Sequence, residues 1–221
     1  MSPGRGGSPR TARRITASSL RDLVRDRLAT PLGADFQIGL STKDLHRVSD
    51  VIVPVFDVDP SVLDRGSAAY RTFTGPAFSA GAANTADWRA ADLGAANGHG
   101  NAASVADVLS PLVTGSGAGP SLRPDTVDLI FREQSNGVDL VNGLHVRWGI
   151  GFALPDRRTL PWLPGGRIAF WGGWGGSMAI ADIDRRMTIS YVMNRMDADL
   201  LGSSRAAAYV GAVYDVVRGS R

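Results

Sequence analysis

The first run of helical periodicity in the chain lies near its N-terminus. Leu20, Leu23, Val24 and Leu28 recur at the three- and four-residue spacing that places them on one helical face. Ser18 or Ser19 is suited to cap the start of this helix, and the stretch Pro31 to Gly33 is suited to stop it. The pattern predicts an amphipathic, half-buried helix.

Two more helices are predicted further along the chain. The stretch 101–113 carries Asn101 or Ser104 as a cap, and the stretch 123–137 carries Pro124 at the first helical position with Asn136-Gly137 as its stop. Residues 50–101 have no clear period and contain three prolines. We expect an irregular segment there, of the kind that often lines or covers a site.

After Gly137 the apolar period changes from three or four to two. The stretch 144–154 is typical of a strand, and residues 177–182 and 187–194 flank the polar turn 183–186 as an antiparallel hairpin. The stretch 203–217, with its Ala-rich face, predicts a closing helix. The order of the predicted elements is helices, then about three antiparallel strands, then a helix. This order favours an α+β fold over a doubly wound parallel sheet.

Composition adds limits to this pattern. With 221 residues, 43% of them hydrophobic, the chain can bury one core, and no apolar run approaches the ~20 residues of a membrane span. No Cys is present, so thiolate chemistry is excluded. No signal peptide is recognisable, and a cytoplasmic location is expected.

The basic excess of the chain is local. Residues 1–17 contain four arginines and no acid, and the remaining 20 basic residues face 21 acidic ones. That balance argues against a nucleic-acid partner. The Gly, Pro, Ser and Arg content of 1–17 predicts a disordered leader, which leaves 18–221 as the folded domain.

The sequence contains no recognisable motif for a metal or a cofactor. His46, His99 and His145 are isolated and form no metal-binding motif, so neither a metal nor a cofactor is predicted. The glycine-rich stretch 114–119 follows a helix instead of a strand and is interpreted as a linker. Lys43, the only lysine, has no phosphate-binding loop before it.

The stretch WGGWGGSMA, residues 171–179, is the most unusual in the chain. Ser177 resembles a nucleophile elbow, but the residues after it alternate as a strand where an elbow needs a helix, so a serine that starts a strand is the better interpretation. The four glycines, at 172, 173, 175 and 176, indicate a close approach by another group. That group is either the chain's own backbone, in a tight turn packed under indoles, or a ligand.

The order of several stretches resembles the serine β-lactamase-related hydrolases, and within them the EstB-type, family VIII carboxylesterases. The resemblance runs from about Ile15 to Val217 and is carried by TPLGADFQIGL, RAADLGAANGHGNAASVADVL, WGGWGGSMAIADIDRRMTISYVMNRM and RAAAYVGAVYDVV. It implies the C-terminal portion of a β-lactamase/transpeptidase-like fold, in which helices flank an antiparallel sheet that is incomplete here.

The resemblance also implies a site. Such enzymes combine Ser-x-x-Lys on a helix, a Tyr-x-Asn motif, and Trp-x-Gly on a strand; the serine forms an acyl-enzyme that water hydrolyses. Trp171, Gly172 and Gly173 match the third motif. The resemblance implies that this strand lies along a small-molecule ester and that the backbone N–H near Trp174 supplies part of an oxyanion hole.

The other two motifs are absent from this sequence. Lys43 has Leu40 three residues before it, and neither Tyr70 nor Tyr191 begins a Tyr-x-Asn. We therefore predict no catalytic residue in this chain and no ester hydrolysis by the chain alone. Truncation, a frameshift or an internal start would produce such a chain.

Two functional classes remain open at this point. The chain is either part of an esterase, as an inactive remnant or as one half of a split enzyme, or a non-catalytic binding protein that retains the substrate-side strand. An uncovered apolar face predicts association with an N-terminal half or with itself. In the loop Asn97 to Gly100, His99 is expected to have a structural hydrogen-bonding role, and Arg147 and Asp182 are expected to be charges at the sheet edge instead of catalysts.

Overall fold

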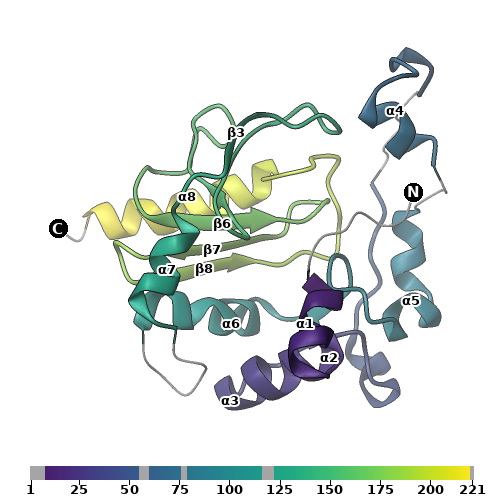
Figure 1. Ribbon diagram of the computed structural model, residues 1–221, viewed down its shortest axis with the longest axis horizontal. Helices are drawn as coiled ribbons and strands as arrows, with labels where there is room; N and C mark the ends of the chain where they lie inside the picture. Colours follow the sequence, from purple (N-terminus) through teal and green to yellow (C-terminus); the bar gives the residue numbers. More distant parts are fainter. Residues whose placement is uncertain (1–7, 55–59, 76–78, 116–121, 220–221) are drawn as a thin grey trace.

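The computed structural model describes residues 8–54, 60–75, 79–115 and 122–219. Its largest unit is a six-stranded antiparallel sheet in the order β3-β4-β5-β6-β7-β8, shown in Figure 1. The strands are β3 (Ser135–Val138), β4 (His145–Trp148), β5 (Ala153–Leu154), β6 (Ile168–Gly172), β7 (Met178–Asp182) and β8 (Met187–Tyr191). The predicted hairpin is confirmed as β7 and β8, and the α+β class is confirmed with more strands than expected.

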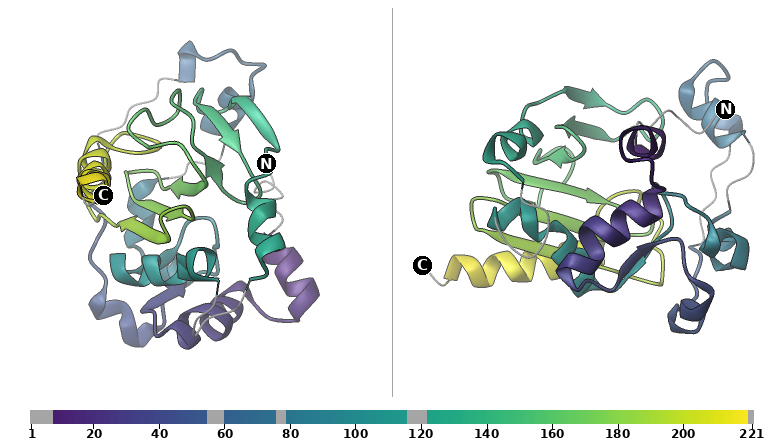
Figure 2. Two further views of the ribbon diagram at one scale, coloured as in Figure 1. Left: turned by 90° about the vertical axis from the view of Figure 1, so that its left-hand side faces the viewer. Right: turned by 60° about the horizontal axis from the view of Figure 1, so that its bottom comes forward.

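Helix α8 (Ser204–Gly219) covers one face of this sheet, as the closing helix of the sequence prediction. Figure 2 shows it along one side of the strands, with α7 (Pro124–Ile130) on the other side. Ala206, Val210 and Tyr214 have no exposed surface, because their spacing of four residues directs all three toward the sheet. They join Phe170 and Ile180 in the core.

Helix α6 (Ala102–Thr114) packs against β7 and β8. Asn101 caps it, since its side chain accepts a hydrogen bond from the Ser104 backbone N–H while the Ser104 hydroxyl accepts one from the Asn101 N–H. Both predicted cap residues are thus used. The Ser190 hydroxyl of β8 donates to the Ala102 carbonyl, which ties the helix start to the strand.

The predicted helix over 123–137 is wrong in its second half. Helix α7 ends at Ile130, whose carbonyl accepts a hydrogen bond from the Ile150 N–H at 3.2 Å, and Gln134 donates its N–H to the Trp148 carbonyl at 2.8 Å. Asn136 and Gly137 therefore belong to strand β3 instead of stopping a helix. Partners distant in sequence override the local helical pattern here.

The stretch 144–154, predicted as one strand, forms two. Strands β4 and β5 pair with each other across a tight connection, with Trp148 opposite Ala153. A side chain at Gly149 would overlap the carbonyl oxygen of Ile130, and Gly151 has a φ of +77°. The close approach of α7 and the left-handed glycine fold the stretch back on itself.

The N-terminal region forms a separate layer of short elements. They are α1 (Ser8–Thr16), α2 (Leu20–Val24), a π-helical turn (Arg25–Ala29), α3 (Thr30–Leu32), β1 (Phe36–Ile38), a 3-10 helix (Thr42–Arg47), a 3-10 turn (Pro60–Val62), α4 (Ala68–Phe73), a 3-10 turn (Ala80–Asn84), α5 (Ala86–Ala90) and β2 (Gly98–Gly100). The irregular segment predicted for 50–101 thus contains several short helices. Strands β1 and β2 pair with each other in a separate sheet.

The first predicted helix is confirmed as a continuous run from α2 to α3. The Ser19 hydroxyl accepts from the Asp22 N–H, and Gly33, at a φ of +62°, ends the run. Its four predicted apolar positions are half-buried.

The structure differs from the prediction of a disordered leader over residues 1–17. Ser8–Thr16 is helical, since Pro9 lies in the first turn, where it is tolerated, and neither Gly nor Pro follows before Ala17. The first seven residues and part of the linker predicted at 114–119 lie outside the described residues. Within the described ranges, no helix combines the length and apolarity that membrane crossing needs.

A buried carboxylate joins the β7–β8 turn to α8. Asp182 is fully buried and accepts hydrogen bonds from the Tyr214 hydroxyl at 3.1 Å and from the Arg185 backbone and side chain at 3.0 and 2.9 Å. Burial raises the pKa of Tyr214, and the charge of Asp182 raises it further. The expectation that Asp182 is a charge at the sheet edge is therefore wrong, because it is fully buried at the end of β7, which lies between β6 and β8, and its charge is met by Arg185 and the Tyr214 hydroxyl.

Tyr214→Phe removes one donor to a buried carboxylate. We expect it to lower the free energy of unfolding by about 1–2 kcal/mol, because Asp182 keeps only its Arg185 partners. Tyr209→Phe, on the exposed side of α8, is the matched control and should change the value by less than about 0.5 kcal/mol. Urea denaturation measures both, and equal effects would contradict this role of the Tyr214 hydroxyl.

Candidate functional site

The candidate site lies where β6 ends and the chain turns into β7. Trp171 is 37% exposed, and its indole lies against that of Trp148, with ring centroids 4.6 Å apart and planes tilted by 39°. Trp148 belongs to β4 and was not singled out from the sequence. The alternating pattern of residues 144–154 was the available signal for a strand at Trp148. The register of β4, β5 and β6 is what brings the Trp148 ring to Trp171.

The turn after Trp171 is closed by its own backbone. Gly173 donates its N–H to the Ser177 carbonyl at 2.9 Å, and Gly176 donates to the Gly173 carbonyl at 3.0 Å. Gly175 donates its N–H to the Asp199 carbonyl and accepts a hydrogen bond from the Asp197 N–H. These two bonds fix the turn against the segment before α8. Trp174, half-buried, lies within this turn.

Three of the four glycines are required by the protein itself. A Cβ at Gly172 would come within 2.7–2.9 Å of Met178, Leu201 and the Ser177 carbonyl. Gly175 and Gly176 have φ of +101° and +111°, and side chains there would collide with Met196 and Ser203 respectively.

Gly173 is different from the other three. Apart from Gly173 itself and its two chain neighbours, no heavy atom of the described residues lies within 4 Å of the place a Cβ would occupy at Gly173, and its φ is not in the left-handed region. Self-packing therefore explains Gly172, Gly175 and Gly176, and among these four glycines an unfilled side-chain position is found only at Gly173. The binding roles of Trp171, Gly172, Gly173 and Trp174 remain predictions.

Ser177 is not built as a nucleophile elbow. It precedes strand β7, whereas an elbow turns from a strand into a helix. Its hydroxyl oxygen accepts a long hydrogen bond, 3.4 Å, from the Met193 N–H. The strand-start interpretation of Ser177 fits this geometry.

A cavity of about 620 Å³ opens between the N-terminal layer and the end of β8. Residues from β1, β2, the start of α6 and the stretch 192–194 line it. Asn97 is buried at its wall, donating to the Trp88 carbonyl at 2.8 Å and accepting from the Leu93 N–H at 3.1 Å. This anchor explains why the loop Asn97 to Gly100 needs an asparagine.

His99 also lines the cavity. Burial lowers the pKa of its imidazole, the Asn97 backbone acts in the opposite direction, and the charge of Arg89 lowers it further. Its Nδ1 atom is buried and has no hydrogen-bond partner among the described residues. In the part of the chain that the structure describes, no group of three His, Asp or Glu side chains could hold a metal ion.

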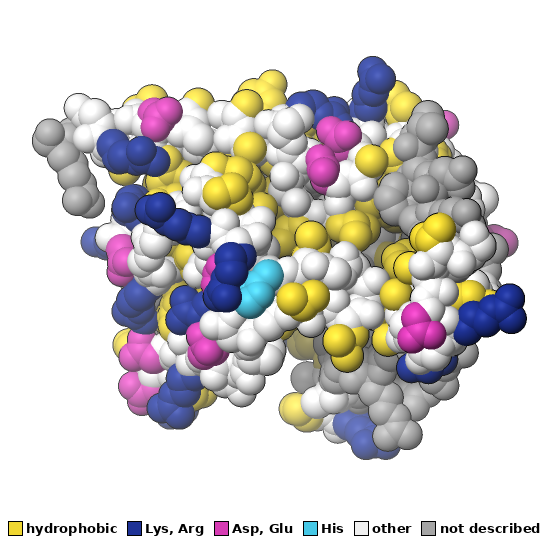
Figure 3. Space-filling model, turned by 90° about the horizontal axis from the view of Figure 1, so that it is seen from above, with side chains coloured by type: hydrophobic (Ala, Val, Ile, Leu, Met, Phe, Trp, Pro, Cys, Tyr) yellow, Lys and Arg dark blue, Asp and Glu magenta, His cyan; other side chains and the backbone are white. Residues whose placement is uncertain are grey.

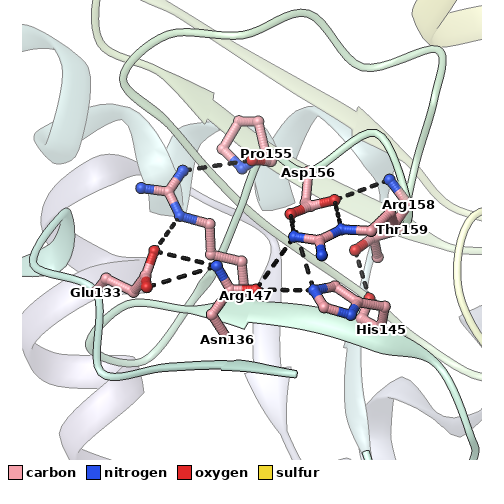
Figure 4. Close-up of polar contacts among 8 residues, drawn as sticks. All are labelled: Glu133, Asn136, His145, Arg147, Pro155, Asp156, Arg158 and Thr159. Atoms are coloured by element: carbon pink, nitrogen blue, oxygen red, sulfur yellow. Dashed lines mark hydrogen bonds and ion pairs between the residues drawn. The ribbon is translucent and has the colours of Figure 1, made fainter. Parts of the chain in front are cut away.

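A polar cluster, drawn in Figure 4, connects β3, β4 and the segment after β5. Arg147 donates to Glu133 at 2.6 Å, and the His145 ring nitrogen lies 2.8 Å from the Asn136 side-chain oxygen. Asp156 accepts from the Arg158 side chain at 2.7 and 2.9 Å. These side chains bind one another, and Arg147, expected to be a charge at the sheet edge, lies on β4 inside the sheet order and is paired with Glu133.

The outer surface near this cluster is mixed in charge. On the face in Figure 3, basic and acidic side chains are interspersed, and hydrophobic side chains gather toward the middle. This face presents no broad basic area of the kind that binds a phosphate backbone.

Gly172→Ala and Gly173→Ala separate the two roles of glycine at this turn. The first should lower the free energy of unfolding by about 1–3 kcal/mol, because its methyl group overlaps Met178 and Leu201. The second should change it by less than about 0.5 kcal/mol, because its methyl group enters open space. Thermal and urea denaturation measure both, and a large loss in Gly173→Ala would show that this glycine also serves the fold.

The ion pair of Asp156 predicts a change of stability with pH. Hydrogen bonds from the Arg158 side chain, and next from its backbone N–H, hold the pKa of Asp156 well below its usual range. The stabilisation is therefore complete above the unfolded pKa of about 4 and is lost as the pH falls through the lower folded pKa.

Asp156→Asn should destabilise the protein at pH 7 and should reduce the further loss of stability between pH 4 and pH 2. Urea denaturation across this range measures the effect. The control is Asp215→Asn, since Asp215 is highly exposed and lies 3.6 Å from Arg218. If Asp156→Asn lost as much stability between pH 4 and pH 2 as the unmodified protein, the role given to the Asp156 ion pair would be refuted.

Comparisons with known proteins agree with this fold. The sequence model of the family described as Beta-lactamase matches residues 10–212. A penicillin-binding protein homolog from Caulobacter crescentus is 28% identical with a TM-score of 0.77, over 94% of this chain and 55% of its own. A family VIII carboxylesterase is 31% identical with a TM-score of 0.79 over the same shares.

EstA from Arthrobacter nitroguajacolicus Rue61a is 25% identical with a TM-score of 0.79, over 96% of this chain and 57% of its own. No curated protein matches the sequence. The chain spans a little more than half the length of these solved structures.

Proposed function

We propose, from the premise that this chain belongs to the Beta-lactamase family, that it is the C-terminal portion of a serine carboxylic ester hydrolase and does not hydrolyse esters by itself. Identity of 31% to a family VIII carboxylesterase supports the esterase assignment. The observation that carries the proposal is the unfilled side-chain position at Gly173, two residues after Trp171, which is 37% exposed.

In the complete enzyme, a serine hydroxyl attacks the ester carbonyl, the alcohol leaves with a proton, and water then releases the acid from the acyl-serine. This chain contributes the other side of the pocket. Trp171, held by Trp148, walls the acyl group, and the absence of a side chain at Gly173 lets the ester approach the end of β6. The N–H groups of Gly173, Gly175 and Gly176 already donate to carbonyls of the protein itself, so these three do not serve as oxyanion donors.

The nucleophile and its base are supplied from outside this chain. The sequence has one lysine and no Ser-x-x-Lys, so the hydroxyl has no amine to accept its proton. The donor of the missing groups is an N-terminal portion, and a chain without that donor is an inactive remnant. A small-molecule ester is the proposed substrate class.

The purified chain should neither hydrolyse p-nitrophenyl butyrate nor form a covalent adduct with a fluorophosphonate. Mass spectrometry of the treated protein checks the adduct, and Ser177→Ala is the control variant. An adduct that Ser177→Ala abolishes would replace this proposal with one in which Ser177 is the nucleophile.

Once an active enzyme is assembled from this chain and an N-terminal portion, Trp171→Ala should lower kcat at least about tenfold, or ~1.4 kcal/mol of transition-state stabilisation. Gly173→Ala should lower kcat/KM without loss of stability. Steady-state kinetics alongside thermal denaturation separate these effects from unfolding. Full activity in both variants would mean that the β6 end does not contact the ester.

A further inference from the structure

Three asparagines of this chain are each followed directly by a glycine. They are Asn97, Asn136 and Asn142. In such a pair the backbone nitrogen of the glycine can attack the side-chain amide carbon of the asparagine, because glycine has no Cβ that hinders the approach. The attack needs an asparagine side chain that can rotate and a glycine nitrogen that can leave its hydrogen bond. The surrounding structure therefore decides which pair reacts.

The fold holds Asn97 in place. Its side chain is buried, donates to the Trp88 carbonyl at 2.8 Å and accepts from the Leu93 N–H at 3.1 Å. Gly98 lies in strand β2, opposite Ile38 of β1. Rotation of the amide toward the Gly98 nitrogen would leave buried polar groups without partners, which is costly.

Asn136 is held by a different set of contacts, drawn in Figure 4. Its side-chain oxygen lies 2.8 Å from the His145 ring nitrogen and accepts a hydrogen bond from Arg158 at 3.4 Å. Its amide nitrogen donates to Glu133 at 3.5 Å. Gly137 is part of strand β3, which pairs with β4. This side chain is exposed, but its partners fix its orientation, and the neighbouring nitrogen belongs to a paired strand.

Asn142 lies in the turn between β3 and β4 and has neither kind of restraint. Asn142 and Gly143 are both exposed, and the Asn142 side chain makes no hydrogen bond with any described residue. The backbone at Gly143 has a φ of +69°, and beyond its chain neighbours nothing lies within 4 Å of the place a Cβ would take. The Gly143 N–H donates to the Asp139 carbonyl at 3.0 Å. This one bond at the tip of a hairpin can open without unfolding the sheet.

We propose that Asn142 is the site at which the folded chain deamidates spontaneously, and that the fold protects Asn97 and Asn136. In the first step the Gly143 nitrogen bonds to Cγ of Asn142, the Cγ–Nδ2 bond breaks, and ammonia leaves with the proton that the backbone nitrogen gives up. Water then opens the succinimide ring. Cleavage between Cγ and the nitrogen gives aspartate, and cleavage between the backbone carbonyl carbon and the nitrogen gives isoaspartate. Water is the only co-reactant, and nothing is oxidised or reduced.

Either product places a new carboxylate beside an existing one. The Asp139 carboxylate already accepts the N–H groups of Val141 and Asn142, at 2.9 and 3.0 Å. Like charges in one turn repel each other, and isoaspartate also lengthens the backbone by one carbon. Among the described strands, β3 pairs only with β4. We therefore expect the loosening to stay within this hairpin and to spare the core cluster.

The test follows the purified chain during incubation at mildly alkaline pH and physiological temperature. Peptide mapping by mass spectrometry with electron-transfer fragmentation reports each asparagine separately and distinguishes aspartate from isoaspartate. Methyl transfer by an isoaspartyl carboxyl methyltransferase is an independent measure of isoaspartate. The reference is the same chain digested to peptides before incubation, in which no fold protects any of the three pairs.

Conversion at Asn142 that is at least tenfold faster than at Asn97 and Asn136 in the folded chain, with comparable rates for all three in the peptides, supports the proposal. Equal rates at Asn142 and Asn136 in the folded chain overturn it, as does an Asn142 that reacts only in the peptides. The same tenfold preference in the peptides would also overturn it, because local sequence would then explain the selectivity.

Two matched variants give a second readout. Asn142→Gln should remove the acidic form that ion-exchange chromatography separates after incubation, and Asn136→Gln should keep it. Circular dichroism confirms that both variants fold. An acidic form that persists undiminished in Asn142→Gln would place the deamidation elsewhere and overturn the proposal.

Discussion

The packing of α8 against the sheet is the constraint on which the rest of this structure depends. Ala206, Val210 and Tyr214 are fully buried in one cluster with Phe170 and Ile180, so the helix and the sheet share this core. The buried Asp182 then fixes the helix along its axis through the Tyr214 hydroxyl.

This constraint extends to the candidate site. The segment leading into α8 brings Leu201 against Gly172 and Ser203 against Gly176, so the turn after β6 is shaped by the start of the helix. Ser203, fully buried, also accepts the N–H of Ala206. Helix packing and turn geometry are thus one arrangement. The backbone of Gly173 takes part in it, and only the side-chain position of Gly173 is left unfilled.

Sequence patterns predicted the elements whose signals are local. The run from Leu20, the helix capped at Asn101 and the β7–β8 hairpin are all specified by side chains within a few residues of the element they define. The errors occur where a distant partner decides. The Ile130 carbonyl accepts a hydrogen bond from the Ile150 N–H where α7 ends. The same close approach of Ile130 to Gly149 accompanies the division of this stretch into two strands.

The candidate site shows the same division. The position of Trp171 at a strand end followed from motif order, whereas Trp148 became part of the site only through the register that joins β4, β5 and β6. Glycine content alone gave no means of separating Gly173 from its three neighbours. That distinction depends on Met178, Leu201, Met196 and Ser203, which approach from three different segments.

The described fold is complete on one side and interrupted on the other, and this asymmetry bears on how such a chain exists. The core cluster is formed entirely by residues 146–214, so the sheet and α8 can bury their shared face without an additional polypeptide. The N-terminal layer, by contrast, meets this region through contacts such as the isolated parallel bridge of Ile52 with Arg195. Under the proposed function, the binding geometry depends on the packing of α8, whereas the covalent step needs a Ser-x-x-Lys motif that this sequence does not contain. The two requirements are therefore physically separable in this proposal.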